Sequence, residues 1–193
     1  MLYILIIVIM MALIAIANII FNQMYDWYVY VVAVVIFTIS SILLDGLVAL
    51  IIRKMNEKHF DYHKRIFNAS PKRIKFYESL GIKKWKDKVL ELGMFTNFRK
   101  NKIDNPKDPM YIRQYILEAC YGVIIHYVSI PASFLILLLD YNMYIGESNL
   151  FLTVALPVAL VNVVLIGAPA LVLRYNLVKL IKIYEIQIRK NKD

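Results

Sequence analysis

Four stretches of this chain are each long and apolar enough to cross a lipid bilayer, which takes about 20 residues of helix. They cover residues 2–21, 27–52, 115–139 and 150–173, with few or no charged side chains. Membrane-spanning β-strands are about 9–11 residues long, so runs of this length predict helices, whose backbone groups bond within the segment. We therefore expect an all-α membrane protein with four transmembrane helices in one integral membrane domain over residues 1–193.

The composition excludes the main alternatives to a membrane protein. Hydrophobic residues make up 60% of the chain and charged residues only 19%, whereas soluble domains carry about 25% charged residues. Cys120 is the single cysteine, so a disulfide-stapled secreted domain is excluded as well. The apolar run over residues 2–21 has no basic start and no small-residue cleavage site, so we expect a membrane helix rather than a cleaved signal peptide.

The basic residues indicate how the helices are oriented. Of the 23 Lys and Arg residues, 17 lie between Arg53 and Arg113 and 6 lie from Arg174 onward. The connectors over residues 22–26 and 140–149 have none. Because Lys and Arg concentrate on the cytoplasmic side of membrane proteins, both termini and both basic segments are expected in the cytoplasm of a multi-pass protein.

The basic loop over residues 53–113 carries its own helix signals. Ser70 followed by Pro71 is typical of a helix start, and Gly81 of a helix end. A second short helix is expected over residues 82–92, with Trp85 on its apolar face and lysines over much of the remainder. A basic amphipathic helix of this kind suits the membrane interface.

Two further signals concern the ends of the later membrane helices. Asp108 stands before the third apolar run and is expected to cap its helix. The tail over residues 174–193 has apolar residues at helical spacing and is expected to form a separate helix lying on the membrane surface.

Three ionisable side chains lie inside the apolar runs, where a charge is costly unless it faces the bundle interior or a wet cavity. Asp45 and Glu118 lie near the cytoplasmic ends of their helices, and His126 lies near the middle of the third. Their depths suggest one cleft that opens to the cytoplasm. His126 is the side chain best suited to transfer a proton near neutral pH.

Plainer interpretations of the same residues remain open. His126 could be a neutral imidazole bonded between helices, and Asp45 could pair with a Lys or Arg at the cytoplasmic boundary. Asn162 is expected to act in helix packing rather than in a site. The lysines could do no more than dock on anionic lipid. His59 and His63 are expected to be solvated surface groups, and no metal site or nucleic-acid partner is expected.

Three short motifs resemble the glycosyl-4,4′-diaponeurosporenoate acyltransferase family. The first runs from Glu78 through Gly81 to Trp85-Lys86-Asp87, and the second contains Glu118 and His126 at the family spacing. The third is Arg174-Tyr175-Asn176. The resemblance covers roughly residues 60–180, in matching order. The chain departs from the family pattern at three positions, which are Val123, Leu173 and Leu177.

The resemblance implies a membrane acyltransferase, because known members esterify a fatty acyl chain to a sugar hydroxyl of a glycosylated carotenoid. The acceptor would be an amphiphile with a free hydroxyl, such as a glycolipid, and the donor an acyl thioester or acyl lipid, with no cofactor. His126 would be the general base, and Glu118 would position the acceptor or support the imidazolium. Lys84, Lys86 and Arg174 would hold donor phosphates or the oxyanion.

The remaining candidate residues have supporting roles in this hypothesis. Asp87 would be the partner of the lysines, and Trp85 would pack at the interface. Tyr175, Asn176 and Asp45 are also expected to line the substrate site. The alternative is a non-enzymatic lipid-binding scaffold or small transport subunit in the bacterial cell membrane, which keeps the basic loop without the chemistry.

Overall fold

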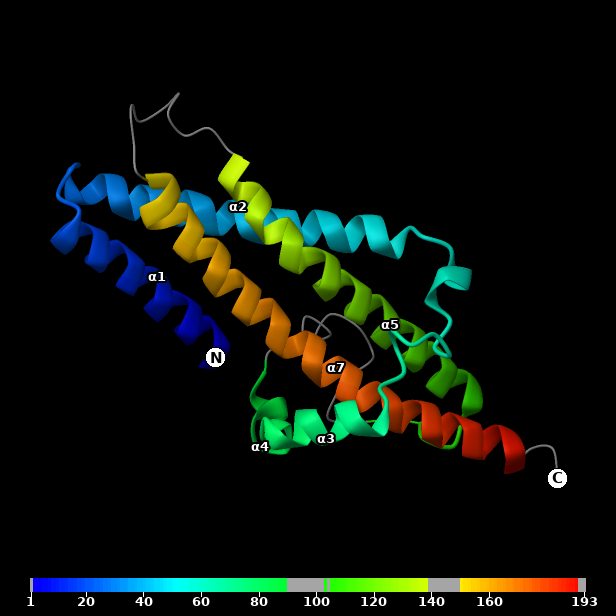
Figure 1. The fold of residues 1–193 in the computed structure, drawn as a ribbon. Helices are drawn as coiled ribbons and strands as arrows, with labels where there is room; N and C mark the ends of the chain where they lie inside the picture. The colour runs from blue at the N-terminus through cyan, green and yellow to red at the C-terminus, as the bar shows by residue number, and fades with distance from the viewer. Residues whose placement is uncertain (1, 90–102, 104, 139–149, 191–193) are drawn as a thin grey trace. The chain divides into compact units, whose positions relative to one another are not determined.

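The computed structural model describes residues 2–89, 103, 105–138 and 150–190. Within these residues 84% are helical and no strand occurs, which confirms the all-α prediction. In chain order (Figure 1) the elements are α1 (Leu2–Phe21), α2 (Trp27–Arg53), the 3₁₀ helix η1 (Glu57–Phe60), α3 (Pro71–Ser79), α4 (Ile82–Trp85), the 3₁₀ helix η2 (Lys86–Lys88), α5 (Pro109–Ala132), the 3₁₀ helix η4 (Ser133–Leu138), the π-helix η5 (Phe151–Ala155) and α7 (Leu156–Lys190). Four of the described segments are long and apolar enough to cross a membrane.

The first two membrane helices end where the apolar runs end. α1 covers residues 2–21, and α2 extends the predicted span by one residue to Arg53. The third begins at Pro109, six residues before the apolar run and directly after Asp108, which caps it as predicted: the backbone N–H of Met110 donates to the Asp108 carboxylate at 2.9 Å. The bounds of α1 and α2 follow from the length of their apolar runs, and the start of the third helix follows from the Asp108 cap.

The fourth helix is longer than predicted. α7 continues without interruption to Lys190, so residues 174–190 extend the fourth span and are not a separate surface helix. Pro169 lies inside α7 and does not end it. The prediction placed a helix end where the basic residues begin, but a change from apolar to basic residues does not break a helix, and no Gly follows Gly167 within α7.

The chain divides into two compact units. Unit 1 consists of residues 1–50 and 127–167. In its core, Tyr30 and Phe37 of α2 are fully buried, as are Ile136 and Leu150 beside the start of α7. The apolar residues of α1 that do not join this core are largely exposed, as expected for a surface that faces lipid.

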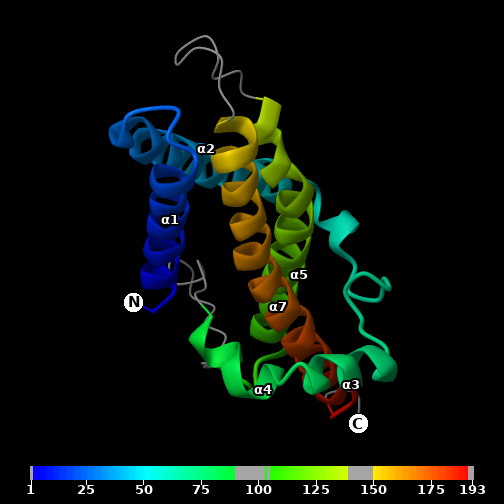
Figure 2. The ribbon, with the colours of Figure 1, turned by 60° about the vertical axis from the view of Figure 1, so that its left-hand side comes forward.

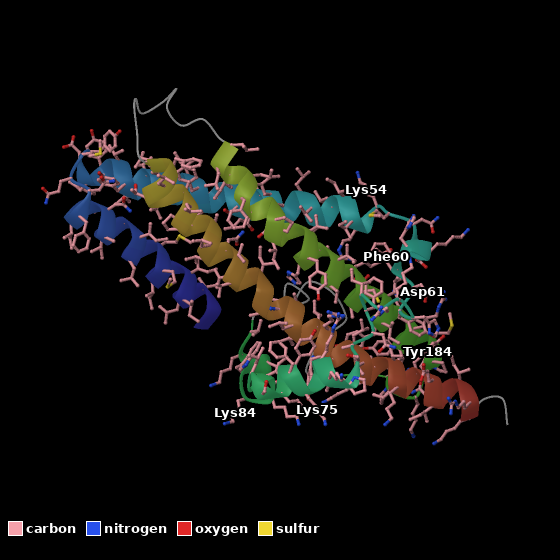
Figure 3. The ribbon with its side chains drawn as sticks, viewed as in Figure 1. Lys54, Phe60, Asp61, Lys75, Lys84 and Tyr184 are labelled. Carbon is pink, nitrogen blue, oxygen red and sulfur yellow. The ribbon has the colours of Figure 1, made fainter. Side chains whose placement is uncertain are left out.

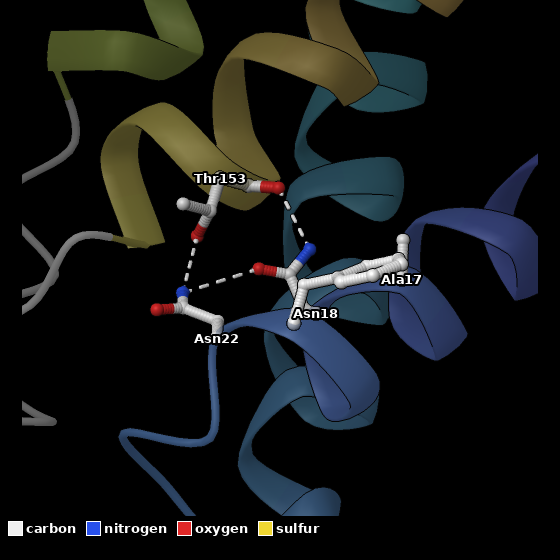
Figure 4. A pocket seen from close by; sticks show the side chains of 5 residues that line it. Ala17, Asn18, Asn22 and Thr153 are labelled. Atoms are coloured by element: carbon white, nitrogen blue, oxygen red, sulfur yellow. Dashed lines mark hydrogen bonds between the residues drawn. The ribbon is translucent and has the colours of Figure 1, made fainter.

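Side-chain hydrogen bonds connect α1 to the beginning of the fourth span within unit 1 (Figure 4). The Asn18 amide donates to the backbone carbonyl of Thr153 at 2.8 Å, and the Asn22 amide donates to the Thr153 hydroxyl at 3.3 Å. These groups line a hollow of about 310 Å³. Because both amide nitrogens are already bonded within the protein, we interpret them as a helix–helix contact.

Unit 2 consists of residues 51–126 and 168–193. In it α3 and α4 lie beside the C-terminal part of α7 (Figure 2). α5 and α7 approach closely at Gly122, where an added Cβ would lie 2.8 Å from the Leu173 Cδ1 atom. A glycine at this position therefore lets the two helices that carry the predicted motifs pack together.

Candidate functional site

The candidate site is built on the turn between α3 and α4. The Ser70 hydroxyl accepts from the backbone N–H of Arg73, with Pro71 in the first turn, which confirms the predicted helix start. Gly81 has a φ of 69°, the left-handed conformation that glycine adopts without steric cost, and it follows the end of α3 as predicted. The Trp85 indole N–H then donates to the Leu80 carbonyl at 3.0 Å and closes the turn.

This turn packs on α7 through residues of two family motifs that are about ninety positions apart. The Tyr175 hydroxyl donates to Glu78 Oε1 at 3.2 Å, and Lys83 Nζ lies 2.8 Å from the same oxygen. Beneath these polar contacts, Tyr77 and Ile82 are buried against Tyr175, in a cluster that also includes Ala69 and Val172. The Glu78-to-Trp85 segment and Arg174-Tyr175 therefore form one structural element of unit 2.

Trp85 is half-buried, and its ring packs against the Tyr77–Tyr175 cluster, so part of the apolar face of α4 contacts protein. The helix is also shorter than predicted, because η2 ends at Lys88 and Val89 is extended. Residues 90–92, where the prediction ended the helix, lie outside the described residues.

Arg174, Asn176 and Lys179 of α7 differ in burial and in the groups that they contact. Arg174 is only 6% exposed, and its guanidinium donates to the backbone carbonyl of Arg65 at 3.0 Å. This bond ties the loop before α3 to α7. Lys179 Nζ lies 4.7 Å from the centre of the Tyr175 ring, in cation–π contact. Asn176 is half-buried.

The predicted phosphate-binding lysines lie at the surface of the same element. Lys84 is exposed and, with Lys75 of α3, extends away from α7 (Figure 3). Lys86 Nζ lies 3.9 Å from Asp87, which agrees with the predicted pairing of Asp87 with a lysine. At this distance the Lys86–Asp87 pair adds little stability.

Glu118 is paired with a residue that the sequence did not single out. Arg53 Nη1, at the end of α2, lies 2.9 Å from Glu118 Oε2 in a salt bridge. The Arg53 guanidinium also lies 5.9 Å from the centre of the Tyr121 ring, and that ring packs on Phe60 with 4.2 Å between centres. Glu118 thus has its charge balanced at the C-terminal end of α2, in the kind of pairing that the sequence left open for Asp45.

His126 lies two turns further along α5 from Glu118. It is partly buried, and among the described residues its side chain has no hydrogen-bond or ion-pair partner. No hydrogen bond joins it to Glu118, as expected for a separation of eight residues, or about 12 Å along a helix. The imidazole is therefore not held by an interhelical bond within the described part of the chain.

Asp45 belongs to unit 1, whereas Glu118 and His126 belong to unit 2. The Asn162 amide donates to Asp45 Oδ2 at 3.4 Å and to the Ser133 hydroxyl at 3.0 Å. Asn162 was predicted to act in helix packing rather than in a site, and its amide joins a polar cluster of α2, η4 and α7.

A profile of the glycosyl-4,4′-diaponeurosporenoate acyltransferase family matches residues 56–186, about two thirds of the chain. The chain belongs to this family. No curated protein and no solved structure gives a significant match. The matched range includes Glu78 to Asp87, Glu118, His126 and Arg174 to Asn176, so it covers the motifs on which the predicted resemblance rested.

The three positions at which the chain departs from the family pattern are packing positions. Val123 and Leu177 are fully buried. Leu173 contacts Gly122 where α5 and α7 approach each other. Apolar side chains at these sites fill the interior of unit 2, so the departures leave the Glu78–Tyr175 contact and the Arg53–Glu118 pair intact.

The Glu78–Lys83 pair predicts a pH dependence of stability. The hydrogen bond from Lys83 lowers the pKa of Glu78, and the same bond raises the pKa of Lys83. A lowered carboxyl pKa contributes stability above the unfolded-state value and loses it as the pH falls through the folded-state value. A raised lysine pKa contributes stability below the unfolded-state value and loses it as the pH rises through the folded-state value.

We expect the pair to be fully stabilising at neutral pH and to be lost at the acidic end. The measurement is the difference in thermal unfolding midpoint between the parent protein and Glu78→Gln, followed from neutral to acidic pH. The difference should shrink as the pH falls. Glu57→Gln, at an exposed glutamate of η1, is the matched control and should give no such trend. A Glu78→Gln difference that is constant with pH would contradict the prediction.

Proposed function

We propose that this protein is a membrane acyltransferase that transfers a fatty acyl chain to a hydroxyl group of a glycolipid-like or other amphiphilic acceptor. The observation that carries this proposal is the family match over residues 56–186. The packing of the Glu78-to-Trp85 motif on Tyr175 supports it, because the two motifs form one element within unit 2. The basic loop faces the cytoplasm of a bacterial cell in this proposal, following the distribution of Lys and Arg.

The proposed reaction uses His126 as the general base. His126 accepts the proton of the acceptor hydroxyl while the hydroxyl oxygen attacks the carbonyl carbon of an acyl thioester. The carbon–sulfur bond then breaks, and the departing thiolate takes the proton from His126, leaving an ester. No metal and no cofactor enters this sequence. A proton acceptor within an apolar helix is consistent with this role, because His is neutral and ready to accept a proton near pH 7.

Other residues have supporting roles in the proposal. Lys84, which is exposed, and Lys86, which is partly buried, attract the phosphates of the donor, since a cluster of lysines raises the local concentration of anions. Glu118, balanced by Arg53, orients the acceptor. Arg174 acts by holding the loop at Arg65 rather than by contacting the donor, because its guanidinium is buried and bonded to backbone.

A direct test reconstitutes the purified chain in lipid nanodiscs with a labelled acyl thioester and a panel of glycolipid acceptors. The proposal predicts a labelled ester whose formation requires both substrates. Lipid extracts from cells with and without the gene identify the natural acceptor, because one acylated species should be absent from the second extract. The proposal is refuted if no labelled ester forms in nanodiscs and the two extracts contain the same acylated lipids.

The contacts of the family-motif residues within the protein favour a second candidate, a lipid-binding scaffold that catalyses no reaction. Trp85, Tyr175 and Arg174 all contact protein atoms, so the family motifs could be maintained for folding alone. A scaffold would bind the glycolipid in nanodiscs and leave its amount in cells unchanged. The two candidates therefore differ in whether the acceptor is recovered acylated.

A further inference from the structure

Helix α3 carries exposed apolar side chains beside the face that packs on α7. Phe76 is 57% exposed and Leu80 is 47% exposed, whereas Tyr77, one position after Phe76, is buried in the cluster with Tyr175. Lys72, Phe76 and Leu80 follow each other at intervals of four residues, so they lie on one side of the helix. The Leu80 N–H donates to the Phe76 carbonyl at 3.1 Å, which continues the helical turn to Leu80. This side of α3 therefore presents one basic and two large apolar side chains outward.

The same helix is positively charged at its surface. Lys72, Arg73 and Lys75 are exposed, and the one carboxylate of α3, Glu78, is paired with Lys83 at 2.8 Å. Lys75 extends away from α7 (Figure 3). Exposed cations beside exposed apolar side chains are typical of helices that bind an anionic lipid surface. In such helices the apolar side chains enter the boundary between headgroups and acyl chains, and the cations contact the headgroups.

The packing of α3 on α7 determines the level at which this surface lies. The fourth span begins at Phe151, and about 20 residues of helix cross the hydrocarbon, which places the other end of the crossing close to Leu171. The cluster between α3 and α7 contains Val172 and Tyr175, and Leu171 packs against it. α3 therefore lies at the boundary of the hydrocarbon, on the side of the basic loop. The side chains that it directs away from α7 are at the level of the headgroups.

We propose that the α3 surface, defined as Lys72, Lys75, Phe76 and Leu80, binds anionic phospholipid. The two apolar side chains enter the region between headgroups and acyl chains, and the two lysines pair with headgroup phosphates. An acidic soluble protein would also match the charge of this surface, but it would have to approach through the headgroup layer. The level of α3 on α7 therefore favours lipid. The inference is independent of the proposed acyl transfer, in which none of these four residues has a role.

The first test uses an added tryptophan as a reporter of depth. Phe76→Trp places an indole at an exposed aromatic position, and the control Lys190→Trp places one about 24 Å beyond Arg174 along α7. Each full-length variant is reconstituted in phosphatidylglycerol nanodiscs, with or without bromine near the top of the acyl chains. The emission of the parent protein, from Trp27 and Trp85, is subtracted. Bromine should quench the added emission of Phe76→Trp several-fold and leave that of Lys190→Trp nearly unchanged.

The second test measures the dependence on headgroup charge. Exchange of phosphatidylglycerol for phosphatidylcholine, or high salt, should reduce the quenching of Phe76→Trp several-fold, because the attraction between lysines and headgroups is removed or screened. In the same background, Lys72→Gln together with Lys75→Gln should have this effect in phosphatidylglycerol. The matched pair Lys182→Gln and Lys190→Gln removes two exposed charges from α7 and should leave the quenching unchanged.

Three outcomes would overturn the proposal. The first is that bromine quenches neither Phe76→Trp nor Leu80→Trp in phosphatidylglycerol. The second is equal quenching in phosphatidylcholine, since the surface would then not select anionic headgroups. The third is an emission that responds only to an added acidic soluble protein, which would assign the surface to a protein partner. None of these measurements uses acyl transfer, so the failure of this proposal is distinguishable from the failure of the proposed function.

Discussion

Replacement of His126 by glutamine is expected to lower the rate of acyl transfer by about 10²–10⁴-fold, the contribution typical of a general base. His126 is the single histidine in the four apolar segments. Within the described residues its side chain makes no hydrogen bond, so the substitution breaks no bond there and the fold should be kept. The measurement is the initial rate of ester formation in nanodiscs at saturating donor and acceptor.

His59→Gln is the matched control, because His59 is an exposed histidine outside the membrane helices. It should retain the full rate. Both variants should unfold at the temperature of the parent protein, which separates a lost base from a lost fold. Full turnover by His126→Gln in an otherwise active preparation would rule out His126 as the base and leave the acyltransferase assignment to stand on other residues.

The helices of this protein could be predicted because their signals are local. Apolar length determined α1 and α2 to within one residue, and Ser70, Gly81 and Asp108 marked helix ends through chemistry within three or four positions of the chain. The predicted helix ends were wrong at Arg174, where the change to basic residues does not interrupt α7, and after Trp85, where the helix ends earlier than the predicted residue 92.

The partners of these helices could not be predicted, because they depend on contacts between distant segments. The apolar face of α4 could have contacted lipid or protein, and the sequence pattern is the same for both. In the structure, residues of this face pack against the cluster that contains Tyr175. Glu118 pairs with Arg53, 65 positions away, and Asp45 lies near Asn162, 117 positions away. No periodicity in the sequence encodes either pairing.

Tyr175→Ala is expected to detach α3 and α4 from α7. Tyr175 is 2% exposed and contacts both helices, so its removal leaves a cavity and should cost about 3 kcal/mol of local stability. Tyr175→Phe keeps the ring and loses only the hydroxyl bond to Glu78, which should cost about 1 kcal/mol. Hydrogen exchange of the α3 and α4 amides, followed in nanodiscs, reports this difference directly.

The two Tyr175 variants also test what the family motif is for. If the motif acts by holding the lysine-bearing turn on α7, acyl transfer should fall in proportion to the loss of protection, and Tyr175→Phe should stay nearly active. Tyr184→Ala, at a half-buried tyrosine further along α7, should leave the α3–α4 amides protected. If Tyr175→Phe is inactive while its amides remain protected, the hydroxyl contacts substrate, and the packing role assigned to Tyr175 is wrong.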